Sequence, residues 1–241
     1  MFKLKTKSQK SRRRVGTPTR TSELKTKYII GIDEVGRGPL AGPVIVAAVM
    51  TPRNFQFSIF NFQKKIKSKL KDSKKLTSKQ REEWNGILRK NFECRYVSIN
   101  NKVIDKIGIQ KAIKLAVRKV LCNLLRNKLR NKIFIYFDGG LYLPKFLNSK
   151  FYRVRHRFTK SRRAGILNSR TIIKGDEKIS VISAASIIAK VARDRKMMRF
   201  HKKYPKYSFD KHKGYGTKLH YKMIKKHKIS KIHRRSFRLN G

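Results

Sequence analysis

The chain is organised around the stretch from Tyr28 to Met50, which reads YIIGIDEVGRGPLAGPVIVAAVM. Its apolar, β-branched start predicts a strand that runs directly into two adjacent acids, Asp33 and Glu34. A glycine-rich turn then leads to a second apolar run from Val44 to Val49. Side chains alternate between the two faces of a regular strand, so the carboxylates would diverge unless the glycines let the backbone bend. Paired acids at the end of a strand indicate a chemical role.

The turn between the two runs contains Gly36, Arg37 and Gly38. Because glycine has no side chain, a ligand can approach the main chain closely at both glycine positions. Arg37 adds a positive charge between them. The turn therefore suits contact with a sugar-phosphate backbone.

The charge of the chain points to a polyanionic partner. Its 241 residues include 64 lysines and arginines but only 13 acids, which gives a net charge of +51. Nucleic acid fits this balance best. A membrane partner is disfavoured because the basic residues are spread over the whole chain and no apolar run is long enough to span a bilayer. A genome biased towards lysine, asparagine and isoleucine is an alternative reason for part of the excess.

The rest of the pattern predicts a mixed α/β sheet covered by helices. The first three strands should be antiparallel neighbours. Further strands are expected at 92–99, 133–137 and 171–173, and helices after Thr77, from Ile109, and at 181–191 and 218–228.

Four of the 13 acids follow apolar, strand-like runs: Asp33, Glu34, Asp138 and Asp176. Acids at the ends of neighbouring strands converge on one edge of a sheet, where they repel one another unless cations neutralise them. Oxygen ligands without nearby cysteine favour Mg²⁺ or Mn²⁺. Two such ions would suit phosphodiester hydrolysis. For each acid taken singly, the alternative interpretation is a helix cap or a surface ion pair.

Other titratable residues are assigned no catalytic role. Asp194, between Arg193 and Arg195, is expected to be an ion-paired helix residue. The histidines show no repeated ligand spacing and are expected on the surface or in loops; they are His156, His201, His212, His220, His227 and His233.

Five segments, in this order, resemble the motifs of ribonuclease HII, the type 2 ribonuclease H. They are GIDEVGRGPLAGPVIVAAV, DSKKLTSKQRE, FDGG, IIKGDEKISVISAASIIAKVARDR and FDKHKGYGT. The resemblance covers residues 28–228. It implies a ribonuclease H-like fold, with a mixed five-stranded sheet flanked by helices and a C-terminal helical extension.

The resemblance also implies an activity. The enzyme would cut the RNA strand of RNA/DNA hybrids, and the 5′ side of ribonucleotides embedded in duplex DNA, by metal-dependent hydrolysis that leaves 5′-phosphate and 3′-hydroxyl ends. The catalytic residues, which also hold Mn²⁺ or Mg²⁺, would be Asp33, Glu34, Asp138 and Asp176. Substrate would be bound by Gly36, Arg37, Gly38, Ser73, Lys74 and Tyr215.

Two alternatives stay open at this point. Ribonuclease HIII shares the strand with paired acids, although GRG here replaces the GKG usual in that family. A non-catalytic protein that binds hybrids through its basic surface is the other alternative, and the intact acids count against it.

The expected domain organisation is a disordered basic tail at 1–27, a catalytic domain at 28–228 and a basic C-terminal tail at 229–241. The domain carries a basic, aromatic insertion at 141–170, which departs from the family and could either bind nucleic acid or be a solvated surface loop. The two cysteines favour a reducing compartment. We expect a monomer in the cytoplasm, or in an organelle if the N-terminal tail is a transit peptide.

Overall fold

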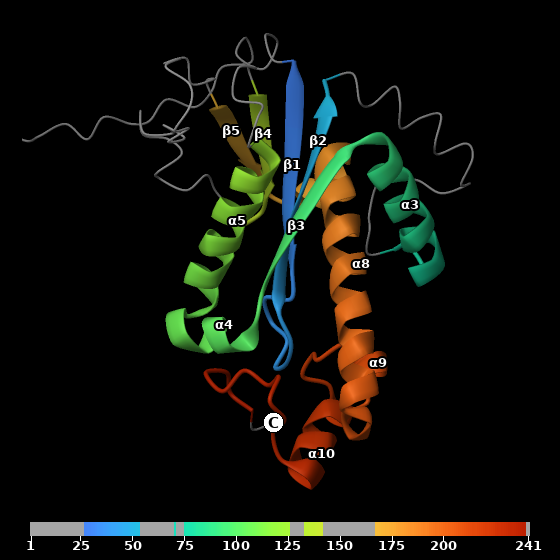
Figure 1. Ribbon diagram of the computed structural model, residues 1–241, viewed down its shortest axis with the longest axis vertical. Coiled ribbons are helices and arrows are strands. Elements are labelled where there is room, and N and C mark those ends of the chain that lie inside the picture. Colours follow the sequence, from blue (N-terminus) through green and yellow to red (C-terminus); the bar gives the residue numbers. More distant parts are fainter. Residues whose placement is uncertain (1–26, 54–69, 71–74, 126–132, 142–166, 240–241) are drawn as a thin grey trace, which may run out of the picture.

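The computed structural model describes residues 27–53, 70, 75–125, 133–141 and 167–239. These residues form a five-stranded sheet in the order β3-β2-β1-β4-β5 with helices on both faces (Figure 1). β1 pairs antiparallel with β2, and β2 with β3, while β4 is parallel to both β1 and β5. The predicted mixed sheet is thereby confirmed. The strands are β1 (Tyr28–Val35), β2 (Val44–Pro52), β3 (Glu93–Ile99), β4 (Ile133–Asp138) and β5 (Leu167–Ile172).

Two helical layers cover the sheet. α4 (Asn101–Ile107) and α5 (Ile109–Leu125) lie on one face, and α3 (Ser78–Asn91) and α8 (Ser180–Lys203) on the other (Figure 1). β2 contributes to both cores, because alternate residues of its apolar run pack towards α5 and towards α8. A strand buried on both faces reads as a continuous apolar run, as it does here.

The start of α3 follows the predicted capping pattern. The Thr77 hydroxyl oxygen accepts a hydrogen bond from the Gln80 N–H (3.2 Å), and the Gln80 side-chain oxygen accepts one from the Thr77 N–H (2.9 Å). This reciprocal pair satisfies two amides that the helix leaves without partners. Trp84 and Leu88 are buried against α8, as expected of the inner face.

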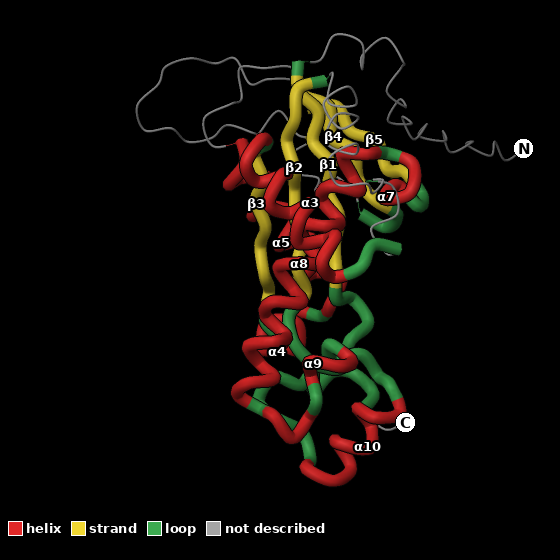
Figure 2. The backbone as a smooth tube through the Cα atoms, turned by 90° about the vertical axis from the view of Figure 1, so that its right-hand side faces the viewer, coloured by secondary structure: helices red, strands yellow, loops and turns green. Residues whose placement is uncertain are grey.

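The chain after α8 forms a C-terminal extension at one end of the sheet (Figure 2). Its core is a small cluster that includes Phe209, Tyr207 and Ile232. The segment 202–217, for which no helix was predicted, contains the short 3-10 helix η1 (Pro205–Tyr207) and α9 (Phe209–His212). The helix predicted at 218–228 is α10 (Lys218–His227), and a further short helix, α7 (Gly175–Lys178), precedes α8.

The expectation of a basic tail after residue 228 is wrong for residues 229–239. His233 is 1% exposed and Arg234 0% exposed, and Ile232 joins the C-terminal cluster. The segment packs because the carbonyl oxygens of a neighbouring loop satisfy the Arg234 guanidinium. A buried arginine cannot be told from an exposed one in a sequence this rich in basic residues.

Several expectations concern residues outside the described ranges. They include the N-terminal tail up to residue 26, Ser73, Lys74 and most of the insertion. β5 begins at Leu167, so the last residues assigned to the insertion belong to the sheet. In the part of the chain that the structure describes, no helix is long and apolar enough to cross a membrane.

Candidate active site

Three of the four predicted acids come together at the C-terminal ends of β1 and β4. These strands are parallel and aligned so that Ile32 lies opposite Phe137, and the next residues along each strand are Asp33 and Asp138. Glu34 follows on β1. The three carboxylates are close enough for the negative charge of Asp138 to raise the pKa of both Asp33 and Glu34.

Burial and neighbouring charges both act on the Asp33 carboxylate. Its pKa is raised well above the ordinary range, first by burial and then by the charges of Glu34 and Asp138. The side chain of Ser186 on α8 and the N–H of Glu34 (2.7 Å) donate hydrogen bonds that partly offset this effect. Burial also raises the pKa of Glu34, while the nearby Arg37 guanidinium (2.8 Å) lowers it. The site favours binding of positive charge.

Asp176 reaches the same region on a different element. It is a buried residue of α7, and the N–H of its neighbour Gly175 donates to the Asp138 carboxylate at 2.6 Å. The Ser183 hydroxyl on α8 donates to the backbone carbonyl of Asp176. The short helix that carries the fourth acid is therefore joined to Asp138 at the end of β4 through the backbone of Gly175.

The carboxylate oxygens of these acids are the kind of ligand that a hard divalent cation prefers. The side chains do not yet surround a common point as a complete set of metal ligands. Within the described ranges, no three histidine, cysteine, aspartate or glutamate side chains are arranged to hold a metal ion. Oε2 of Glu34 is buried and has no hydrogen-bond partner among the described residues. Buried carboxylate oxygens need a proton donor or a cation, and Mg²⁺ and Mn²⁺ prefer such oxygen ligands.

The turn between β1 and β2, residues 36–43, lies beside the acids, and we name it the recognition turn. Gly36 has a φ of +89°, and a Cβ at this position would lie 2.4 Å from Nε of Arg193 and 2.8 Å from the Pro43 carbonyl oxygen. Only glycine fits there. A Cβ on Gly38 would meet no heavy atom within 4 Å. The turn therefore packs on α8 at its first glycine and leaves space for a ligand at its second.

Tyr215 is brought to the same turn by the C-terminal extension. The Gly214 carbonyl accepts hydrogen bonds from the N–H groups of Leu40 (2.8 Å) and Ala41 (3.3 Å). The Tyr215 ring is 43% exposed, and the Arg193 guanidinium lies 5.3 Å from its centroid. Two segments more than 170 residues apart along the chain thus form one surface.

Sequence reasoning missed the side chains that support these residues. Ser186 was given no role, yet its side chain bonds Asp33. The signal available was a hydroxyl within an otherwise apolar stretch. Arg193 and Arg234 carry no such signal, because they are two among 64 basic residues. Asp194 is ion-paired with Arg81 (3.9 Å), as expected.

The expected location on the surface or in loops is wrong for His212 and His220, which are buried on α9 and α10. His233 lies in a loop, as expected, but is also buried. The Ser230 N–H donates to Nδ1 of His233 (2.9 Å), Nε2 of His233 lies 3.1 Å from Nε2 of His220, and Nδ1 of His220 lies 2.9 Å from the Tyr215 carbonyl oxygen. Only neutral rings satisfy this chain, with His233 donating to His220 and His220 donating to Tyr215.

This histidine chain predicts acid sensitivity. Burial lowers the pKa of His220 and His233 from 6.5 to about 4. Between these pH values the unfolded chain binds protons that the folded chain does not, so the free energy of unfolding falls as the pH drops through this window. Between pH 7 and pH 4.5 the free energy of unfolding should fall in both proteins. We expect this fall to be smaller in His233→Gln than in the parent protein, by on the order of 1–2 kcal/mol.

Urea unfolding across this pH range measures the difference. Asp33 and Glu34, whose pKa is raised, contribute with the opposite sign, and comparison of parent and variant cancels their effect. If the free energy of unfolding depended on pH equally in both proteins, the result would contradict a hydrogen-bonded chain of neutral histidines. His212, whose ring stacks on His220 at 4.2 Å, remains in both proteins.

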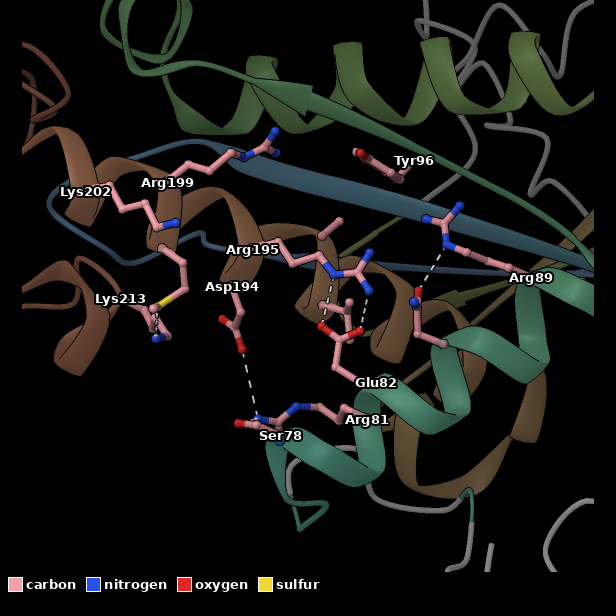
Figure 3. Close-up of a pocket in the computed structure, with 14 residues that line it drawn as sticks. Ser78, Arg81, Glu82, Arg89, Tyr96, Asp194, Arg195, Arg199, Lys202 and Lys213 are labelled. Atoms are coloured by element: carbon pink, nitrogen blue, oxygen red, sulfur yellow. Dashed lines mark hydrogen bonds and ion pairs between the residues drawn. The ribbon is translucent and has the colours of Figure 1, made fainter. Parts of the chain in front are cut away.

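A cavity of about 660 Å³ lies elsewhere, between α3 and α8 (Figure 3). Its two acids are occupied by arginines, since Glu82 pairs with Arg195 (2.5 Å) and Asp194 with Arg81. None of the four predicted catalytic acids lines it. Its chemistry is that of a basic, internally ion-paired groove, so the acid cluster is the stronger candidate for catalysis.

Comparisons with known proteins identify the family of this chain. The family model for ribonuclease HII matches residues 30–240. A ribonuclease HII from Sulfurovum sp. strain NBC37-1 is 39% identical over 216 residues, covering 90% of this chain and 94% of that protein. One from Sulfurihydrogenibium sp. strain YO3AOP1 is 42% identical over 212 residues, covering 88% and 90%.

Solved structures show the same fold. The ribonuclease H2 of Pyrococcus horikoshii OT3 gives a TM-score of 0.62 at 24% identity, covering 88% of this chain and 94% of that chain. The ribonuclease HII of Archaeoglobus fulgidus, solved in complex with PCNA, gives 0.64 at 26% identity, covering 88% and 96%. The predicted ribonuclease H-like fold is confirmed. The chain belongs to the ribonuclease HII family and is a hydrolytic endoribonuclease of the ribonuclease H type.

Proposed function

We propose that this ribonuclease HII cuts the RNA strand of RNA/DNA hybrids and the 5′ side of a ribonucleotide embedded in duplex DNA. The products would carry 5′-phosphate and 3′-hydroxyl ends. The observation that carries the proposal is the meeting of Asp33, Glu34 and Asp138 at the ends of two parallel strands, beside a glycine turn with room for a ligand.

The proposed cofactor is Mn²⁺ or Mg²⁺, held by Asp33, Glu34, Asp138 and Asp176. Mutual repulsion among buried carboxylates, and the unsatisfied oxygen of Glu34, support cation binding here. When bound, the ions supply an activated water and neutralise charge on the leaving 3′ oxygen.

The protein's own residues would bind and orient the nucleic acid. Arg37 is 41% exposed at its side chain and pairs with Glu34, so it can meet a phosphate beside the acids. The open space at Gly38 admits a ribose close to the main chain. The half-exposed ring of Tyr215 can pack on the sugar that follows, where a 2′-hydroxyl would clash. Ser73 and Lys74 remain predicted phosphate contacts outside the described residues.

The test is cleavage of duplex DNA that contains one ribonucleotide, with Mg²⁺, with Mn²⁺ and with a chelator. We expect a nick on the 5′ side of the ribonucleotide only when metal is present. Ligation of the downstream product to a 3′-hydroxyl strand reports the 5′-phosphate. An all-DNA duplex of the same sequence is the control and should stay intact.

Other outcomes would identify the alternatives. A strong preference for long hybrids over the lone ribonucleotide would favour a ribonuclease HIII-like specificity. Tight binding of both duplexes without a metal-dependent nick would favour a non-catalytic hybrid-binding protein. The monomeric state, the cytoplasmic location and the remaining domain assignments stay predictions.

A further inference from the structure

The buried Arg234 makes contacts of an unusual kind for a charged side chain. Its guanidinium donates to the carbonyl oxygens of Gly36 (2.6 Å), Arg37 (2.9 Å) and Gly42 (3.0 Å). Among the described residues it forms no ion pair with a carboxylate. A buried charge is costly unless hydrogen bonds compensate it, and here these three hydrogen bonds all go to one loop, the recognition turn, while the Phe237 ring lies 5.0 Å from the guanidinium.

These bonds fix which way the turn presents its amides. Every peptide bond in the described part of the chain is trans, so each N–H points opposite to the carbonyl of the same peptide unit. The Gly36 and Arg37 carbonyls point at Arg234. The N–H groups of Arg37 and Gly38 therefore point away from it, and the turn has open space around the Cα of Gly38. Arg234 thus presents two adjacent donors to a ligand.

The same short segment holds the loop that carries Tyr215. His233 precedes Arg234 and is linked through His220 to the Tyr215 carbonyl. Backbone hydrogen bonds join the segment to the recognition turn as well, from the Arg234 N–H to the Leu40 carbonyl (2.8 Å) and from the Gly42 N–H to the Ile232 carbonyl (2.9 Å). We name residues 230–237 the C-terminal strap.

We infer that the C-terminal strap sets the position of the recognition turn relative to Tyr215, and that Arg234 and His233 are positioning residues for recognition of a ribonucleotide followed by a deoxyribonucleotide. The inference rests on the proposed function. The strap bonds the two recognition loops, and its side-chain hydrogen bonds with Asn101 and Asp105 place its other side on α4. Its loss should therefore impair substrate recognition more than the chemical step.

Arg234→Met tests the inference, because it keeps an unbranched apolar stem and removes every donor. Arg235→Met is the matched control: it makes the same chemical change at the exposed neighbouring residue. Steady-state kinetics would use two duplexes, one with a single ribonucleotide and one uniform RNA/DNA hybrid. The key quantity is the ratio of kcat/KM for the first duplex to kcat/KM for the second.

We expect Arg234→Met to lower kcat/KM on the single-ribonucleotide duplex by about tenfold or more, mainly through KM, and to lower the ratio. Arg235→Met should leave the ratio unchanged. Arg234→Lys should recover part of it, because an ammonium group keeps the charge and can donate to some of the carbonyls. If Arg234→Met fails to fold, His220→Leu keeps Arg234 on the recognition turn, removes the two hydrogen bonds that link His233 to the Tyr215 carbonyl, and should lower the same ratio.

The readouts separate the possible failures. An unchanged ratio in folded strap variants, or losses on both duplexes that merely follow the fall in Tm, would overturn the inference and leave the strap a structural element. If the parent protein itself does not cut the single-ribonucleotide duplex, the proposed function fails, and the strap inference fails with it.

Discussion

Asp138→Asn should lower kcat by at least about a thousandfold while changing the affinity for RNA/DNA hybrid by no more than about threefold. The substitution keeps the shape of the side chain and an oxygen that can accept the Gly175 N–H. It removes the charge that acts on both Asp33 and Glu34. An amide is a weaker ligand for a hard cation than a carboxylate, so the variant should hold hybrid but not metal.

Asp194→Asn is the matched control for this prediction. It removes the same charge from an acid that is paired with Arg81 on α3, away from the catalytic cluster. Single-turnover cleavage should be near that of the parent protein. Addition of Mn²⁺ should raise the Tm of the parent and of Asp194→Asn but not of Asp138→Asn, which reports cation binding without activity. Turnover retained by Asp138→Asn would reject its assignment as a metal ligand.

The parts of the structure that sequence reasoning predicted are those with local causes. The β1 to β2 stretch, the buried β4 and the cap at Thr77 follow from apolar runs, alternation and capping chemistry within a few residues. The candidate acids followed from their place at strand ends, since the register of β1 and β4 brings Asp33 and Asp138 together. The assignment of these acids to catalysis stays a proposal.

The parts that it missed depend on contacts between distant segments. Arg234 is satisfied by carbonyls almost 200 residues earlier, and no local pattern distinguishes it from the exposed Arg235. His220 and His233 are buried because α10 and the C-terminal strap bring both rings against Phe209. Whether a side chain is buried depends on contacts with segments that are distant in the sequence. In a chain this rich in basic residues, the few that are buried and structural cannot be recognised from the sequence.

The close packing of α8 on β1 at Gly31 explains how Ser186 and Asp33 are held together. A Cβ on Gly31 would lie 2.1 Å from the Val181 carbonyl oxygen and 2.7 Å from the Ile182 nitrogen, both in the first turn of α8. Backbone atoms in a helix cannot turn aside as a side chain can. Gly31→Ala would therefore have to push α8 away from the central strand, along with the serine that bonds Asp33.

We expect Gly31→Ala to lower the free energy of unfolding by about 3 kcal/mol or more. Gly86→Ala is the matched control, because Gly86 lies inside α3 with no heavy atom within 4 Å of the added Cβ. Helix propensity predicts that it stabilises the protein by about 0.5–1 kcal/mol. Urea unfolding of both variants measures the contrast. Similar stabilities would mean that α8 does not approach β1 this closely, and the support that Ser186 gives to Asp33 would lose its structural basis.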